Sequence, residues 1–233
     1  MKKVFILFIA FASLTCLSQD NLILKKEGKT LQNIIPKGWK ILDSKKGDLN
    51  KDGILDLVFA IQNTDKKNIE SNDGLGADTI DLNPRILGIY FGSKSGGFTQ
   101  KLVSNHFIIL QDIPTMDEPF DGFSISKKGV LDIKFKFWFS AGSWTMSNNT
   151  YRFCYQNNEF ALIGYDSSET HRGTGETTDY SINFLTKKMK IVKGSFSNEV
   201  SETVDWKEIS LERLITLKDI DKPFELDFEG IRL

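Results

Sequence analysis

The sequence predicts an all-β protein built from antiparallel hairpins, and two observations carry this prediction. Segments rich in Ile, Val, Phe and Tyr recur along the chain, and several alternate apolar with charged residues, the pattern of a half-buried strand. Polar or glycine-rich turns separate these segments at hairpin spacing. The predicted strands are 54–61, 86–91, 130–139, 151–156, 160–165 and 180–185.

The segment 130–139 shows the alternation most clearly. Its apolar side chains share one face, which carries Leu131, Ile133, Phe135, Phe137 and Phe139. The opposite face carries Asp132, Lys134, Lys136 and Trp138. Because successive side chains of a strand point to opposite faces, this segment is expected to have one buried and one solvated side.

Turns and short helices complete the predicted elements. Hairpins are expected at 92–97, at 156–159 and at 186–188, the last joining 180–185 to 189–192. One helical turn is expected at 31–35, which Pro36 stops. A short helix is expected at 210–217, with Leu211, Leu214 and Ile215 on its buried side. The polar stretch 63–84 is expected to be a long surface loop.

A weak internal repeat suggests how the strands are arranged. The segment 54–59 resembles 130–135, and 89–91 followed by a turn and Phe98 resembles 151–153 followed by a turn and Phe160. Repeated antiparallel units of this kind predict either propeller-like blades or a stacked β-sandwich, with one or two short helices.

The N-terminus has the composition of a secretory signal peptide. Lys2 and Lys3 precede a short apolar run and a small-residue exit, so residues 1–18 are expected to be removed. The run is too short to cross a bilayer, and no transmembrane segment is expected in the mature chain. The mature protein, residues 19–233, is expected to be one β-rich domain in the periplasm or outside the cell. A lipoprotein anchored through Cys16 is the alternative.

Charge and cysteine content give no indication of nucleic-acid binding or of an internal disulfide. Removing Lys2 and Lys3 from 30 basic residues leaves 28 against 31 acidic ones, a formal net charge of −3. Such mild acidity gives no reason to expect nucleic acid as a partner. Cys154 becomes the only mature cysteine, so no internal disulfide is expected, and its place among aromatic residues indicates a strand position.

The most informative motif is an acidic loop at 48–56. Oxygen-bearing residues fall at its first, third, fifth and ninth positions, and Gly53 at the sixth permits a sharp turn. The expected metal ligands are the side chains of Asp48, Asn50, Asp52 and Asp56 and the backbone carbonyl of Ile54. Oxygen donors alone favour Ca²⁺ over a transition metal. Phe59 stands where an EF-hand has its glutamate, and the residues that follow read as strand.

The motif Gly47-Asp-Leu-Asn-Lys-Asp-Gly-Ile-Leu-Asp-Leu-Val58 resembles the calcium loops of FG-GAP repeats, also called VCBS repeats. In those repeats the loop joins two strands, so the resemblance implies a structural Ca²⁺ between strands. A wider set of phrases looks like an uncharacterised family of secreted bacterial proteins, and it supports the compartment and fold class only. These phrases lie at 47–50, 151–156, 160–166, 173–176 and 180–186.

Two functions from different classes follow as hypotheses. The first is an exported, calcium-stabilised, non-enzymatic binding or structural module at the bacterial envelope, with a protein or glycan ligand that Trp138 or Trp144 could contact. No catalytic residue is assigned under this hypothesis, and the oligomeric state stays open. In a related possibility, the segment 222–228 would be an edge strand in a larger assembly.

The second hypothesis is a small periplasmic hydrolase. It would use His171 as a general base, or a pair of carboxylates from an acidic segment. The acidic candidates are Asp112, Asp117, Glu118 and Asp121.

Overall fold

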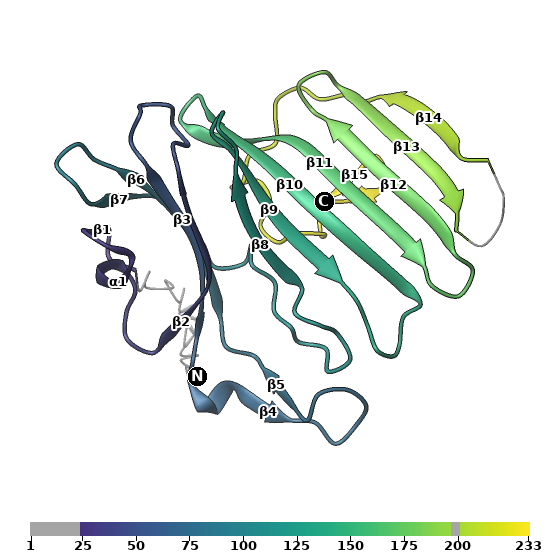
Figure 1. Ribbon diagram of the computed structural model, residues 1–233, viewed down its shortest axis with the longest axis horizontal. Helices are drawn as coiled ribbons and strands as arrows, with labels where there is room; N and C mark the ends of the chain where they lie inside the picture. Colours follow the sequence, from purple (N-terminus) through teal and green to yellow (C-terminus); the bar gives the residue numbers. More distant parts are fainter. Residues whose placement is uncertain (1–23, 197–200) are drawn as a thin grey trace, which may run out of the picture.

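Two antiparallel sheets form the framework of the protein in the computed structural model, which describes residues 24–196 and 201–233. The signal peptide expected at 1–18, with Cys16, lies outside these residues. The first sheet has five strands (Figure 1). Their order is β1 (Glu27–Gly28), β7 (Phe98–Ser104), β6 (Arg85–Gly92), β3 (Asp56–Asn63) and β2 (Trp39–Gly47).

The second sheet has seven strands and carries the longest hairpin. Its order is β14 (Thr203–Glu208), β13 (Lys188–Ser195), β12 (Glu176–Asn183), β11 (Glu159–His171), β10 (Thr145–Gln156), β9 (Val130–Phe137) and β8 (Phe120–Ile125). Two small hairpins pair β4 (Ile69–Ser71) with β5 (Thr79–Asp81) and β15 (Asp227–Phe228) with β16 (Ile231–Arg232). The predicted all-β, antiparallel class is therefore confirmed, and each predicted strand corresponds to an observed one.

The two segments aligned in the sequence repeat occupy equivalent places. β3 is the second strand of the run β2, β3, β6, β7, in which each strand pairs with the next. β9 is the second strand of the corresponding run β8, β9, β10, β11. Each run is a four-stranded antiparallel meander, the topology that a propeller blade also has.

The sheets adjoin where β2 runs beside β8. Both strands have a bulge at this point, between Ile41 and Asp43 in β2 and between Phe120 and Gly122 in β8. The Asp43 carboxylate accepts hydrogen bonds from the backbone N–H of Ser44 at 2.7 Å and of Phe123 at 2.8 Å. A side chain thus links the two strands where backbone pairing is interrupted.

One hydrophobic core joins both sheets to the C-terminal segment. It contains Val58, Leu87 and Ile89 from the first sheet and many aromatic side chains from the second. The chain after β14 crosses one face of the seven-stranded sheet, behind β9 to β11 in Figure 1, and adds Leu217 and Leu233 to this core. Leu233 is fully buried in this core.

The other face of the five-stranded sheet has a smaller core. Phe59, Ile61 and Tyr90 pack there under α1 (Leu31–Ile34), the helical turn expected at 31–35. Thr30 caps this turn by accepting a hydrogen bond from the N–H of Asn33. Because both faces of β3 and β6 are covered, these strands are apolar along nearly their whole length.

Two sequence expectations differ from the structure. The helix expected at 210–217 is wrong, because this segment is irregular and Thr216 forms an isolated bridge with Ala161 of β11. Leu211, Leu214 and Ile215 do pack on the core, but from an irregular chain. The stretch 63–84 is not a structureless loop, since it contains the helical turn η1 (Lys66–Asn68) and the hairpin of β4 and β5.

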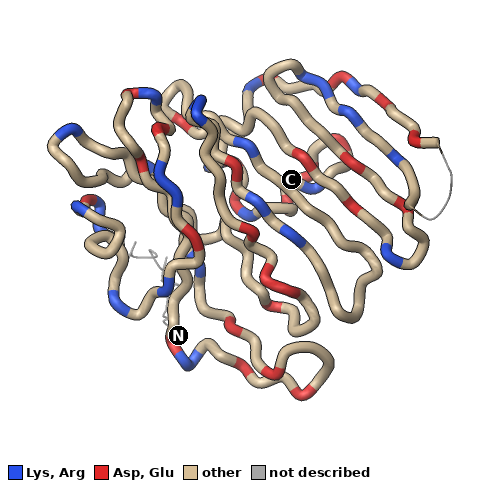
Figure 2. The backbone as a smooth tube through the Cα atoms, in the orientation of Figure 1, with Lys and Arg blue, Asp and Glu red and all other residues tan. Residues whose placement is uncertain are grey.

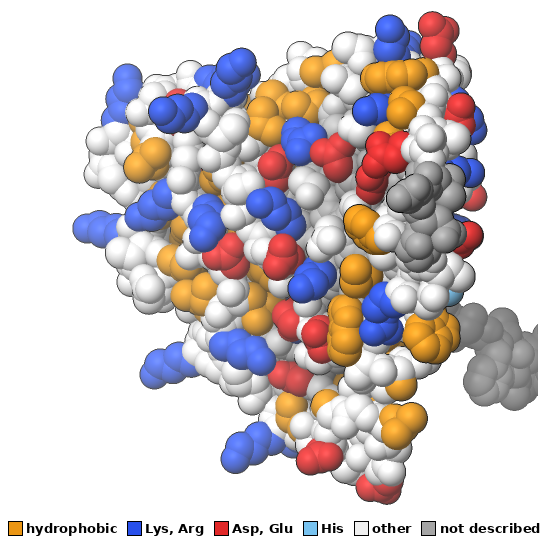
Figure 3. Space-filling view, turned by 45° about the vertical axis from the view of Figure 1, so that its right-hand side comes forward, with side chains coloured by type: hydrophobic (Ala, Val, Ile, Leu, Met, Phe, Trp, Pro, Cys, Tyr) orange, Lys and Arg blue, Asp and Glu red, His pale blue; other side chains and the backbone are white. Residues whose placement is uncertain are grey.

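Basic and acidic residues are interspersed along the strands of both sheets (Figure 2). In the view of Figure 3, hydrophobic side chains at the surface are likewise interrupted by charged ones. β14 forms one outer edge of the seven-stranded sheet, and all six of its residues are exposed.

Gly88 provides a test of the packing between β3 and β6. It pairs with Phe59, whose ring lies over it, and a Cβ added at Gly88 would lie 2.3 Å from the Phe59 Cζ. Gly88→Ala should therefore lower the free energy of unfolding by about 2 kcal/mol, measured by urea denaturation. Gly194→Ala is the control, because its nearest neighbour is the flexible Glu202 side chain, and it should cost below about 0.5 kcal/mol. Equal urea midpoints for the two variants would contradict this packing.

Candidate functional site

The acidic loop is the hairpin connection between β2 and β3, as the sequence predicted for a loop joining two strands. Lys51 and Gly53 both have positive φ, 65° and 83°, so the chain turns sharply at these two points. The glycine at the sixth loop position is thus required by backbone conformation.

Asp48, Asn50 and Asp52 accept hydrogen bonds from the backbone between Asp52 and Ile54. The Asp48 carboxylate accepts from the N–H of Asp52 at 3.1 Å and of Gly53 at 2.9 Å. Asn50 Oδ1 accepts from the same Asp52 N–H at 3.1 Å, and Asp52 accepts from the N–H of Ile54 at 2.8 Å. Oxygens of Asp48 and Asn50 therefore converge on one amide, and the loop closes into a compact ring.

Asp56 differs from these residues because it is fully buried. Its carboxylate accepts three backbone hydrogen bonds, from Leu49 at 2.8 Å, Asn50 at 3.2 Å and Gly92 at 2.9 Å. Burial raises the pKa of Asp56, and the three N–H donors oppose that rise. Asp56 thus joins both ends of the loop to the end of β6.

The loop's donors are chemically suited to a hard cation. Asp48, Asn50 and Asp52 present oxygen atoms near solvent, while Asp56 is held in the interior by N–H groups. Within the described residues, no group of three or more His, Cys, Asp or Glu side chains has the geometry of a metal site. The five ligands expected from the sequence therefore stay a prediction, with Asp56 in a different environment from the others.

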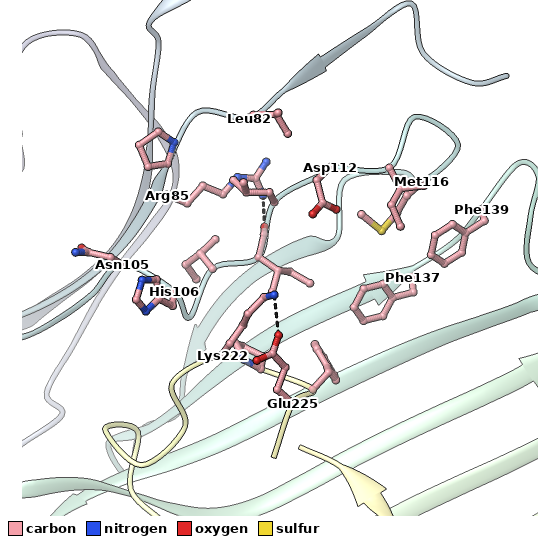
Figure 4. A pocket seen from close by; sticks show the side chains of 17 residues that line it. Leu82, Arg85, Asn105, His106, Asp112, Met116, Phe137, Phe139, Lys222 and Glu225 are labelled. Carbon is pink, nitrogen blue, oxygen red and sulfur yellow. Dashed lines mark hydrogen bonds and ion pairs between the residues drawn. The ribbon is translucent and has the colours of Figure 1, made fainter. Parts of the chain in front are cut away.

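A sizeable cavity lies elsewhere among the described residues, and we call it the intersheet cavity. It has a volume of about 580 Å³ and is lined mainly by apolar side chains (Figure 4). Its walls come from the start of β6, the loop 105–116, the end of β9 and the C-terminal segment. Its apolar lining includes Leu82, Ile109, Ile113, Met116, Phe137 and Phe224.

Arg85 forms one wall of this cavity, although its side chain is only 3% exposed. Its guanidinium binds both oxygens of Glu118, at 2.6 and 2.7 Å, and donates to the Ile109 carbonyl at 2.8 Å. Its Nε–H is buried and has no hydrogen-bond partner among the described residues. The ion pair holds the loop 109–118 against β6 and leaves one donor unused.

Two pairs of basic and acidic side chains lie at the rim of the intersheet cavity. Lys222 Nζ lies 2.7 Å from Glu225 Oε1, and this pair, with Asp112 and Asp221 farther off, raises the pKa of Lys222. His106 Nδ1 lies 3.0 Å from Asp221 Oδ1, with both side chains exposed. The cavity therefore has an apolar interior and a rim of mixed charge.

The structure disperses the residues considered for catalysis. His171 Nδ1 contacts the Thr174 hydroxyl at 2.9 Å within its own turn, and that hydroxyl contacts Glu176 at 3.1 Å. Of the acidic candidates at 112–121, Asp112 lines the intersheet cavity, whereas Glu118 is paired with Arg85. His171 does not line the intersheet cavity.

The two tryptophans and the C-terminal segment considered as contact sites lie in different environments. The Arg172 guanidinium lies over the Trp138 ring, 5.0 Å from its centroid, while Trp144 is 67% exposed. The segment 222–228 is not an edge strand along its length, because Phe224 enters the core and only Asp227–Phe228 is strand.

Sequence reasoning missed Arg85 and the cavity that it lines. The available signal was a charged residue at the head of an otherwise apolar strand, Arg85-Ile-Leu-Gly-Ile-Tyr-Phe91. Such a residue needs a partner in the interior.

Comparisons with known proteins found no relative of this chain. No family model matches the chain, and neither a curated protein nor a solved structure matches it. In the part of the chain that the structure describes, no helix has the length and apolar character needed to cross a membrane.

The ion pair of Arg85 and Glu118 should contribute strongly to stability. Glu118→Gln leaves the buried guanidinium without its counter-charge, and because the Glu118 side chain is itself 45% exposed, we expect a loss of about 2 kcal/mol in the free energy of unfolding. Glu225→Gln is the control, because its pair with Lys222 is more than half exposed on both sides and should contribute below about 1 kcal/mol. Chemical denaturation measures both, and a Glu118→Gln loss no larger than the control would count against this ion pair.

Proposed function

We propose that this protein is an exported, non-enzymatic binding module whose intersheet cavity accepts the apolar part of a small amphipathic ligand. We further propose that one Ca²⁺ in the loop 48–56 stabilises the fold. The signal-peptide pattern at 1–18 supports export, and the lining of the intersheet cavity carries the binding proposal.

The cavity has the size and surface of a small-molecule site. Its volume of about 580 Å³ falls within the range of known ligand pockets, and its lining is largely aliphatic and aromatic. The buried Nε–H of Arg85 is a donor that a ligand oxygen would satisfy. Because Glu118 already balances the Arg85 charge, an uncharged hydroxyl or carbonyl suits this donor better than a carboxylate.

The charged groups at the intersheet cavity favour ligand binding over catalysis. Arg85, His106 and Lys222 each contact a carboxylate, at 2.6, 3.0 and 2.7 Å respectively. Pairs of this kind fix the shape of the wall and rim. A general base needs instead to reach the proton of a reacting group.

The calcium proposal is supported by the loop geometry. Oxygens of Asp48 and Asn50 converge on the N–H of Asp52, and the Asn50 amide donates to Asp52 Oδ2 at 3.0 Å, so three of the expected ligands belong to one hydrogen-bonded ring. A divalent cation in this ring would be attracted by its acidic side chains.

Calcium should raise the melting temperature, and Asp52→Ala should remove that effect. Asp52 is exposed and belongs to the expected ligand set, so its loss should lower stability in calcium while changing little in chelator. Asp73→Ala, at an exposed site in the β4–β5 hairpin, is the control and should keep the full calcium response. Thermal unfolding with calcium and with chelator measures this, and identical wild-type curves would rule the calcium site out.

Linear alkanols should bind the intersheet cavity in proportion to their chain length. Each added methylene should strengthen binding by about fourfold until the cavity is filled, because burying a CH₂ is worth ~0.8 kcal/mol. Calorimetric titration of a homologous series measures this slope.

Two isoleucines of similar exposure provide the matched variants. Ile113 is 43% exposed and lines the cavity, whereas Ile69 is 40% exposed and lies in β4. Ile113→Arg should weaken alkanol binding at least about tenfold by bringing a charge to the apolar lining. Ile69→Arg should bind as the wild type does. The cavity is not the site if alkanol affinity does not depend on chain length. It is also not the site if the two variants change the affinity equally.

A further inference from the structure

A second cavity lies on the inner face of the seven-stranded sheet, and we call it the inner-face cavity. It has a volume of about 370 Å³ and is separated from the intersheet cavity by Phe137 and Phe224, which line both. Its lining comes from β9 to β12 and the C-terminal hairpin. The residues are Phe137, Ser147, Asn149, Tyr165, Ser167, Glu169, Tyr180, Phe224, Gly230, Ile231 and Arg232.

The polar lining arises from strand register. Tyr151 and Tyr165 pair across β10 and β11 with both rings in the core. Moving two residues along each strand keeps the same face, and the next pair on that face is Asn149 with Ser167. The pair after that is Ser147 with Glu169. The inner face thus changes from aromatic to polar side chains over two successive cross-strand pairs.

These polar groups form an ordered network. The Tyr165 hydroxyl donates to Asn149 Oδ1 at 3.0 Å, and Asn149 Nδ2 donates to Ser147 Oγ at 3.0 Å. Asn149 is only 5% exposed, so its amide is fixed in position. An amide carries two N–H groups and a hydroxyl both donates and accepts, so Asn149 and Ser147 retain capacity beyond these two bonds.

Charge and aromatic content restrict the ligand further. The charged residues in the lining are Glu169 and Arg232, which balance each other, so an ionic ligand gains little. Phe137, Tyr180 and Phe224 supply ring surfaces that favour contact with C–H groups. A suitable ligand therefore has many hydroxyls, no net charge and one less polar face.

We propose that the inner-face cavity binds a neutral saccharide unit. Its ring hydroxyls would exchange hydrogen bonds with Ser147, Asn149 and Ser167, while its C–H face packs on an aromatic wall. This site is separate from the proposed alkanol site, so loss of either proposal leaves the other standing.

Ser167 and Ser168 offer a matched test. They are adjacent in β11 on opposite faces, and Ser167 alone lines the cavity. Saturation-transfer NMR would titrate the methyl glycosides of glucose, galactose, mannose and N-acetylglucosamine and their linear oligomers. At least one should bind saturably, and Ser167→Ala should weaken it about 3- to 10-fold, whereas Ser168→Ala should not.

Phenylalanine substitutions at the same two positions test the cavity by filling it. Ser167→Phe should fill the cavity and abolish binding, whereas Ser168→Phe should bind normally, with thermal melts confirming that both fold. If Ser167→Phe does not fold, the two alanine variants decide. The proposal is overturned if no neutral sugar binds the wild type, if a uronate or hexose phosphate binds in their place, or if the Ser167 and Ser168 variants behave alike.

Discussion

Packing around the Tyr151 ring joins the seven-stranded sheet to the loop 105–116 and to the C-terminal segment. Its ring contacts aromatic side chains from the second sheet and from two loop segments, namely Phe107, Phe135, Phe153, Tyr165 and Phe224. A buried hydroxyl must find a partner, and that of Tyr151 accepts the Phe224 N–H at 3.1 Å. Burial also raises the pKa of Tyr151 far above its usual value, so it stays neutral. Phe224 holds a left-handed φ of 67°, uncommon for an aromatic residue, and forms a wall of both cavities.

Strand identity was predictable because its signal is local. Alternation in 130–139 reports which face is buried, and Leu131, Ile133 and Phe135 are indeed the buried side. The error at 210–217 has the opposite cause. The spacing of Leu211 and Leu214 suits a helix, but the chain there pairs with β11, and sequence periodicity does not reveal a distant partner. Tertiary pairing overrode a short helical pattern.

The same distinction applies to the candidate sites. The turn at Gly53 and the oxygens of the loop could be predicted because they lie within nine consecutive residues. The burial of Asp56 could not, since one of its donors is Gly92, the last residue of β6. Both cavities are assembled from segments that the fold brings together, and Phe137 and Phe224 line each of them. Their lining depends on strand register and on where the C-terminal segment lies, which local patterns do not encode.

The outer strands of the two sheets determine how this protein behaves in a crowded solution. An unpaired strand edge is a template on which another chain can add, and this is the usual beginning of fibrous aggregation. β2 and β8 face each other, which leaves β1 and β14 as the outer edges. β1 has only two residues, and β14 carries Asp205, Lys207 and Glu208 beside the exposed Val204 and Trp206. The shortness of one edge strand and the charges on the other both oppose the addition of a further strand.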